Sequence, residues 1–337
     1  MTAKLLRGAV LSIVVGLALA GCDHATDFDG PRLIDRFGDF ALLDTLTASQ
    51  NVVAFSSGES VVFSARFNKQ VNWVVEITGQ QSGAVKRIEG FSDELTAENA
   101  RWEGGTTELP LFKEEAVEAL LFVPDEDSDT TRVAIEVIET REYPGDVVAD
   151  FEADGGSDIA VGNFEFELAP ESGLSAEVPP GEGDAFFLFR GTDNVVNNFF
   201  VGLIDITPGE VTPDGEGYFE VPTSVPEELY FNAFLYSFDT PNTIAVIQVI
   251  ADANGTGAFE DGQDDVFPIF DMPVDWSGWR AIGIPLSETA ITQAQAQEIV
   301  AVRVLLISDN NAQPSPPLPV EYGIDYITFT AGGPLEL

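Results

Sequence analysis

Short runs in which apolar and polar residues alternate recur along most of the chain. In the run VVFSARF at residues 61–67, every second side chain is apolar or small. The same period of two returns at residues 73–77 and 133–137. This alternation predicts β-strands with one buried face, and turn residues such as Ser57-Gly58 separate the strands. Residues 46–142 therefore predict a small β-sandwich of the immunoglobulin-like type.

The alternating pattern resumes after Glu142-Tyr143-Pro144-Gly145, a stretch whose proline and glycine indicate a junction. One helix is predicted, from Ser287 to Gln297, with Ser287 as its N-cap. Many strands with hardly any helix favour an all-β chain, with a larger jelly-roll β-sandwich over residues 146–332. Its predicted strands are residues 164–168, 185–189, 199–206, 230–238, 243–250, 279–284, 300–308 and 322–330.

The composition changes this picture mainly through charge. Hydrophobic residues make up 45% of the 337 residues, too many for a disordered chain. The 57 Asp and Glu residues against 15 Lys and Arg residues give a net charge of −42. Nucleic acid is excluded as a partner, because binding it needs a basic face. The acids are spread along the whole chain, which favours adaptation to high salt over a cation-binding surface or plain solubility.

The N-terminus has the features of a signal peptide. Two basic residues, Lys4 and Arg7, precede an apolar run that is too short to cross a bilayer. The run ends in Leu19-Ala20-Gly21-Cys22, which resembles the lipobox of bacterial lipoproteins, in which the cysteine is diacylated. We expect residues 1–21 to be removed, Cys22 to carry the lipid, and residues 22–45 to form a flexible tether. Ordinary secretion with an incidental cysteine is the alternative.

Three segments of the C-terminal half resemble carbohydrate-binding modules. They are Asp150-Phe151-Glu152, the run WRAIGIPLS at residues 279–287 and the run YGIDYITF at residues 322–329. Galactose-binding-like jelly rolls often open with DFE, carry a strand of the form W-x-x-x-x-x-P-L-S and finish with I-D-x-I-x-F. The resemblance covers residues 146–332 and concerns the fold more than any ligand. With the export signal, the chain resembles the surface glycan-binding lipoproteins of polysaccharide-degrading bacteria.

This resemblance implies a non-catalytic lipoprotein of the cell envelope, on the outer membrane or cell surface. It would bind polysaccharide or oligosaccharide and meet the membrane through its lipid anchor only. An outer-membrane importer is the candidate partner. Two alternatives stay open: a structural or adhesive envelope protein whose jelly roll contacts protein, and a glycoside-active enzyme.

Residues for catalysis are scarce. The one histidine, His24, follows Cys22 in the predicted tether, and Cys22 is the one cysteine. A Ser-His-Asp or Cys-His arrangement therefore cannot be assembled, and no G-x-S-x-G or H-E-x-x-H motif is present. A pair of carboxylates could still form a glycosidase site. We nevertheless expect no enzyme, because small sandwiches leave little room for the deep cleft usual in glycosidases.

Two loops carry side chains suited to sugars, which bind through aromatic faces and through amides or carboxylates. The first, at residues 191–198, is rich in asparagine, and the second, at residues 274–279, holds two tryptophans. Trp279 begins a strand, so we expect it to pack in the core. Trp276 precedes a Ser-Gly turn and suits an exposed platform and packing equally. The predicted sugar-binding residues are Trp276, Asp193, Asn194, Asn197 and Asn198.

The loop DANGTGAFEDGQDD at residues 252–265 resembles an EF-hand-type calcium loop. Oxygen-bearing residues stand at its first, third and fifth positions, a glycine at the sixth and an apolar residue at the eighth. Strands flank the loop where helices would stand, and Gln263 replaces the usual glutamate. The predicted calcium ligands are Asp252, Asn254, Thr256, Glu260, Asp261 and Asp264. The alternative is a solvated hairpin end in a protein rich in acids everywhere.

The resemblance to carbohydrate-binding modules implies a second, structural calcium ion. It would lie between the acid of the DFE segment, Glu152, and the acid of the last strand, Asp325. The alternative is that both carboxylates face solvent at strand ends.

Overall fold

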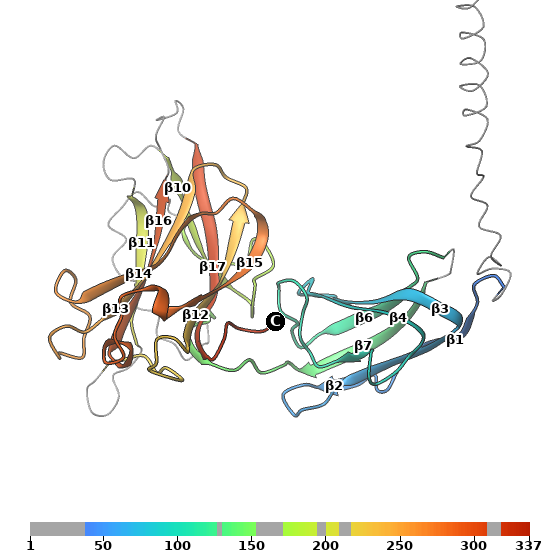
Figure 1. Cartoon of the computed structure of the whole chain (residues 1–337). Helices are drawn as coiled ribbons and strands as arrows, with labels where there is room; N and C mark the ends of the chain where they lie inside the picture. Colours follow the sequence, from blue (N-terminus) through green and yellow to red (C-terminus); the bar gives the residue numbers. More distant parts are fainter. Residues whose placement is uncertain (1–37, 127–129, 153–170, 194–199, 209–216, 309–317) are drawn as a thin grey trace, which may run out of the picture. The chain divides into compact units, whose positions relative to one another are not determined.

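The computed structural model describes residues 38–126, 130–152, 171–193, 200–208, 217–308 and 318–337. Within these ranges the chain is all-β, with two short 3-10 turns, which confirms the fold class (Figure 1). The described residues from Leu42 to Leu337 belong to one compact unit. Cys22 and His24 lie outside the described residues. In the part of the chain that is described, no helix is both long and apolar enough to cross a membrane.

The N-terminal strands form one sheet in the order β1-β3-β6-β7-β2, with β4 and β5 also paired to β3. Every pairing is antiparallel except that of β2 with β7. The first half of the long β3 pairs with β1, β5 and the end of β4, and its second half pairs with β6 and the rest of β4. The strands are β1 Leu42–Ala48, β2 Val52–Ala54, β3 Val61–Gly79, β4 Val85–Leu95, β5 Arg101–Trp102, β6 Ala116–Phe122 and β7 Thr131–Glu139.

The alternation along β3 explains the packing of this sheet. Phe63 and Trp73 point inward and are fully buried. The Trp73 ring crosses β4 at Gly90, where a Cβ atom would collide with it, and its Nε1 donates to Ser92 Oγ at 2.8 Å. Strand β1 begins at Leu42, inside the range predicted as tether, because Asp44 pairs with Arg66 of β3 through backbone register and an ion pair of 2.8 Å.

The C-terminal strands form two sheets. The larger has the order β15-β12-β17-β10-β9, with β8 paired to β17, and the smaller has the order β11-β16-β13-β14. All of these pairings are antiparallel. The strands are β8 Asp146–Ala149, β9 Gly173–Ser175, β10 Phe186–Thr192, β11 Phe200–Ile206, β12 Leu229–Phe238, β13 Thr243–Ala251, β14 Asp265–Pro273, β15 Ser277–Pro285, β16 Ile299–Ser308 and β17 Pro319–Ala331.

The main hydrophobic core lies between these two sheets. Phe187 and Phe231 of the larger sheet meet Ile247 and Val304 of the smaller one, and all four are buried. The whole cluster is drawn from residues 148–329. Because the core takes alternate residues of each strand, the remaining side chains of the larger sheet face away from it.

The outer face of the larger sheet carries a second group of aromatic residues. Phe186 and Tyr236 pack edge-on against Trp279, with ring centroids 5.4 and 5.1 Å apart. The Phe186 ring lies over Gly323, where a Cβ atom would come within 2.8 Å of it. Trp279 is half-buried, and its Nε1 donates to Pro179 O at 2.7 Å. The sequence predicts Trp279 in the core, but it packs against Phe186 and Tyr236 outside the main core.

The predicted helix over residues 287–297 is wrong. Only 3-10 turns form there, at Leu286–Glu288 and Gln295–Gln297. The hydroxyl of Thr289 donates to Leu286 O at 2.7 Å and accepts from Ile291 N at 3.1 Å, so it competes with helical hydrogen bonds. The predicted strand at residues 164–168 lies outside the described residues. The boundary between two sandwiches stays a prediction, since residues 42–337 form one unit.

Candidate functional site

The carboxylate of Asp252 is the centre of the acidic loop 252–265. It is 4% exposed. Its Oδ1 accepts from the amides of Asn254 and Gly255 at 2.9 and 2.7 Å. Its Oδ2 accepts from the Gly257 amide at 2.7 Å and from the Tyr218 hydroxyl at 3.0 Å. Burial acts to raise the pKa of Asp252, but these four hydrogen bonds outweigh it and lower the pKa to about 2.

The other predicted calcium ligands of this loop also have hydrogen-bond partners. Asp264 accepts from the amides of Ala253 and Glu260 at 3.3 and 2.7 Å. The Asn254 amide donates to Glu260 at 2.6 Å, and Arg303 donates to Asp261 at 2.9 Å. The Thr256 hydroxyl donates to the Ala258 carbonyl at 3.2 Å.

The loop is thus tied by its own polar groups rather than opened around a cavity. Across the described residues, no group of three or more His, Cys, Asp or Glu side chains is arranged to hold a metal ion. Calcium in this loop stays a prediction.

The second predicted pair, Glu152 and Asp325, meets at one loop. Asp325 is fully buried, so it does not face solvent. Its Oδ2 accepts from the Glu182 amide at 2.9 Å and its Oδ1 from the Tyr326 amide at 2.8 Å. Burial raises the pKa of Asp325 well above its usual value, against the opposing effect of these amides. Glu152 Oε1 accepts from the amides of Asp184 and Ala185 at 2.6 and 3.0 Å. Residues 181–185, here the clamped loop, are therefore anchored by both carboxylates.

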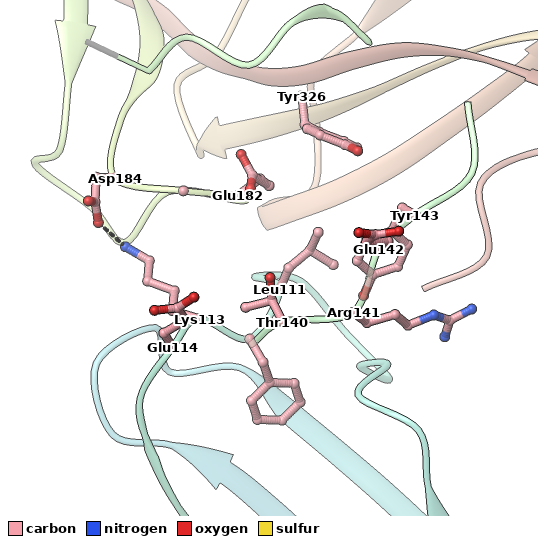
Figure 2. Close-up of a pocket in the computed structure, with 12 residues that line it drawn as sticks. Leu111, Lys113, Glu114, Thr140, Arg141, Glu142, Tyr143, Glu182, Asp184 and Tyr326 are labelled. Carbon is pink, nitrogen blue, oxygen red and sulfur yellow. Dashed lines mark hydrogen bonds and ion pairs between the residues drawn. The ribbon is translucent and has the colours of Figure 1, made fainter. Parts of the chain in front are cut away.

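A pocket of about 490 Å³ opens beside the clamped loop. Figure 2 shows Glu182 and Tyr326 on one side of this pocket and Leu111, Thr140 and Tyr143 on the other. We call it the tyrosine pocket. Its lining residues are Leu111, Phe112, Lys113, Glu114, Thr140, Arg141, Glu142, Tyr143, Glu182, Gly183, Asp184 and Tyr326.

Burial dominates the electrostatics of the tyrosine pocket. It raises the pKa of Glu182 to about 7, and the charges of Glu152 and Asp150 add to that effect. It also raises the pKa of Tyr143 and of Tyr326 to about 12, so both hydroxyls are protonated at neutral pH. The pocket therefore offers neutral phenol groups as hydrogen-bond donors beside a carboxyl that titrates near neutrality.

The cations of the tyrosine pocket already have partners. Lys113 Nζ lies 2.7 Å from Asp184 Oδ1, the ion pair drawn in Figure 2. The Arg141 guanidinium lies 5.1 Å from the centre of the Tyr143 ring. In Figure 2 the Arg141 side chain extends away from Glu182.

The predicted sugar-binding residues do not line this pocket. Trp276 is half-buried, packs against the main core and has the Arg280 guanidinium 4.4 Å from its ring centre. Asp193 is fully buried and accepts from the Leu318 amide at 2.7 Å and from Asn242 at 3.3 Å. Asn194, Asn197 and Asn198 lie outside the described residues.

Sequence reasoning missed the tyrosine pocket. The sequence pattern predicts only a junction at Glu142-Tyr143, and it predicts Tyr326 only as part of a strand motif. The available signal was a tyrosine directly before a Pro-Gly turn, at a point where a strand pattern stops. That signal does not indicate which residues line the pocket together with Tyr143, because Tyr326 and Glu182 come from distant parts of the chain.

Comparisons with known proteins give structural neighbours only. No protein-family model matches the chain, and no curated protein matches it. A family 11 carbohydrate-binding module from Clostridium thermocellum, in complex with a β-1,3-1,4-mixed-linked tetrasaccharide, is 13% identical. It has a TM-score of 0.33 and covers 56% of this chain and 95% of its own.

Two surface glycan-binding proteins cover more of the chain. One, from Prevotella bryantii, is 12% identical with a TM-score of 0.34 and covers 87% of this chain and 77% of its own. SGBP-B from a xyloglucan utilization locus in Bacteroides uniformis is 11% identical with a TM-score of 0.36, covering 85% and 72%. The neighbours are thus carbohydrate-binding modules and surface glycan-binding proteins, but TM-scores this low carry no argument about the ligand.

Proposed function

We propose that this protein binds polysaccharide, without catalysis, as a lipid-anchored protein of the cell envelope. Residues 182–184 and Tyr326 of its C-terminal β-sandwich would form the site together with residues 111–114 and 140–143. The tyrosine pocket is the observation that supports this function. Its volume of about 490 Å³ falls in the range of small-molecule sites. Its lining combines two tyrosine rings with carboxylates, a threonine and apolar side chains.

This combination suits a sugar for two physical reasons. The ring faces of Tyr143 and Tyr326 can cover the apolar side of a pyranose. The phenol hydroxyls and the Glu182 carboxyl can exchange hydrogen bonds with sugar hydroxyls in a partly desolvated place, where each bond is stronger than in water. The clamped loop supports binding because it holds Glu182 in a fixed position before any ligand arrives.

The test is a glycan array probed with the chain from residue 22 onward, at several salt concentrations. We expect retention on at least one polysaccharide. Tyr143→Ala should weaken that binding by about 5-fold, since an aromatic contact is worth roughly 1 kcal/mol. Phe91→Ala is the matched control, because Phe91 is an exposed aromatic residue of β4, outside the pocket. No retention on any plant or algal polysaccharide would sink the proposal.

One observation favours a second candidate, a glycoside-active enzyme. Glu182 has its pKa raised to about 7 and lies in a pocket with other carboxylates, as the general acid of a glycosidase does. Release of reducing sugar from a bound polysaccharide, abolished in Glu182→Gln, would establish this activity. We expect bound polysaccharide to be recovered intact.

The anchor belongs to the same proposal. Cys22 would carry the lipid and hold the protein at the outer membrane or cell surface, where an importer could take up captured glycan. Metabolic labelling with a fatty acid should mark the protein, and Cys22→Ser should lose the label. Labelled protein with serine at this position would contradict the anchor.

A further inference from the structure

The clamped loop fixes the direction in which Glu182 points. The Asp325 carboxyl group accepts from the Glu182 amide at 2.9 Å, and Glu152 accepts from the amides of Asp184 and Ala185 at 2.6 and 3.0 Å. Gly183 between them has a φ of +53°, and a Cβ atom there would collide with Glu152. The backbone on both sides of Glu182 is therefore set by hydrogen bonds, and its side chain projects into the tyrosine pocket (Figure 2).

The Glu182 carboxylate has no counter-ion among the described residues. The Arg141 guanidinium of the same pocket lies against the Tyr143 ring. The neighbours Glu152, Asp150 and Asp184 of Glu182 are acids, and Lys113 is the cation whose charge opposes theirs. That lysine is already paired with Asp184 at 2.7 Å. A half-buried carboxylate in such a place is stabilised by any positive group that enters the pocket.

The walls of the pocket suit the same kind of group. A ring face attracts a cation through its quadrupole, and the pocket is lined by the rings of Tyr143 and Tyr326. Tyr143 already receives one cation in this way, the Arg141 guanidinium 5.1 Å from its ring centre. Phe234 supports Tyr326 from the sheet, with ring centroids 5.5 Å apart. Aromatic faces beside a carboxylate are the elements that recognise an ammonium group.

We infer that the tyrosine pocket binds the ammonium group of an amino sugar, with Glu182 as its counter-ion. The ligand class is therefore a glycan with free, non-acetylated hexosamine units. This inference rests on the proposed carbohydrate binding and specifies its ligand. Glycans rich in uronate or sulfate are excluded, because they would bring a second negative charge to Glu182 in a chain of net charge −42.

The test compares two tetrasaccharides that differ in charge and acetylation only: the tetramer of glucosamine and the tetramer of N-acetylglucosamine. Both are titrated calorimetrically into the chain from residue 22 onward, at about 1 M NaCl, where screening removes unspecific attraction to the acidic surface. We expect the glucosamine tetramer to bind at least about 10-fold more tightly, a difference of roughly 1.4 kcal/mol.

Glu182→Gln keeps the shape of the side chain and removes its charge. It should abolish this preference while leaving the melting temperature of the free protein within a few degrees. Glu288→Gln, which removes an exposed carboxylate of the first 3-10 turn, should keep the preference. An unchanged preference in Glu182→Gln would overturn the inference, because the attraction would then come from elsewhere on the acidic surface.

Failure of the ligand class and failure of the function give different results. Equal affinity for both tetramers, or binding of neutral polysaccharides alone, overturns the amino-sugar inference and leaves carbohydrate binding in place. Absence of any glycan binding overturns both. Calcium is a separate outcome: if the ion stabilises the wild type but not Glu182→Gln, and glucosamine shows no preference, the pocket is a metal site and the inference is wrong.

Discussion

Single carboxylates organise the local structure of this acidic protein. Asp252 accepts four hydrogen bonds and closes a loop whose residues recur at the spacing of a calcium loop. Glu152 and Asp325 accept backbone amides of the clamped loop in the same manner. In each case the side chain that the sequence predicts as a calcium ligand accepts hydrogen bonds from backbone amides and so fixes the loop. The two roles do not exclude each other, since a carboxylate can accept an amide and bind a cation.

The lowered pKa of Asp252 predicts a pH-dependent contribution to stability. Its pKa is about 2 in the folded protein, against 3.8 for an unperturbed aspartate. A carboxyl with a lowered folded pKa stabilises the fold above its unfolded pKa, and this contribution is lost as the pH falls through the folded value. We therefore expect the difference in unfolding free energy between wild type and Asp252→Asn to shrink between pH about 4 and about 2.

The measurement is urea denaturation of both proteins at each pH, with Asp271→Asn as a control for an exposed aspartate of β14. Subtraction of the variant from the wild type removes the acid destabilisation that all other carboxylates cause. A difference that stays constant from pH 5 to pH 2 would contradict the role assigned to Asp252.

At the scale of elements, the loop 252–265 is held in place by several side chains at once. The loop 252–265 is tied at Asp252, at Asp264 and, through Asp261, at Arg303 of β16. Phe259 adds its ring 5.4 Å from the Arg303 guanidinium. The loop therefore contacts the smaller sheet through Arg303, whereas a solvated hairpin end would make no such contacts.

Calcium binding by the loop 252–265 remains a prediction. We expect millimolar calcium to raise the melting temperature of the chain from residue 22 onward, because an ion that binds only the folded state stabilises it. Asp252→Ala should abolish the part of this increase that comes from the loop 252–265. Glu152→Ala should abolish any increase in melting temperature that comes from a calcium ion between Glu152 and Asp325. Identical melting curves in calcium and in chelator would refute both sites.

The outer face of the larger sheet yields a packing prediction. The Phe186 ring occupies the space above Gly323, where an added Cβ would lie 2.8 Å from it. Gly323→Val should therefore lower the unfolding free energy by on the order of 2 kcal/mol, since the ring and strand must shift. Gly333→Ala is the control, because an added Cβ there meets nothing. Denaturant unfolding measures both, and equal effects of the two substitutions would contradict the packing argument.

At the scale of the whole molecule, the dominant feature of the composition is its negative charge. A net charge of −42 repels itself at low ionic strength, and few of the 57 acids have a basic partner because the chain has only 15 Lys and Arg residues. The same charge keeps polyanions away and concentrates cations near the surface. It therefore agrees with a cationic sugar as ligand.

Salt should stabilise this protein. Raising NaCl from about 0.1 M to about 1 M shortens the screening length from roughly 10 Å to roughly 3 Å, which removes most repulsion between surface carboxylates. We expect the melting temperature to rise over this range. Potassium chloride at equal ionic strength separates screening from specific binding of sodium. A melting temperature that falls or stays level in both salts would contradict adaptation to high salt.

The strands of this protein could be predicted from the sequence, because alternation of apolar and polar residues is a local pattern. The observed β12, β13 and β16 each contain the run predicted for them, and β3 joins the two runs predicted at residues 61–67 and 73–77 into one strand. The failure at residues 287–297 is also local in origin, since threonine hydroxyls form hydrogen bonds that a helical pattern does not reveal. Glu152 and Asp325, which the resemblance places around one calcium ion, both accept amides of the clamped loop, and the ion itself stays a prediction.

The tertiary structure alone decided what those acids hold and where a ligand can enter. Asp325 and Glu182 are 143 residues apart, and nothing local in either segment indicates that a buried carboxylate meets that amide. Likewise Tyr143 and Tyr326 become the walls of one pocket only because β8 pairs with β17. Burial, which sets the pKa of Glu182 near 7 and makes its missing counter-ion significant, is a property of the packed chain and not of any stretch of its sequence.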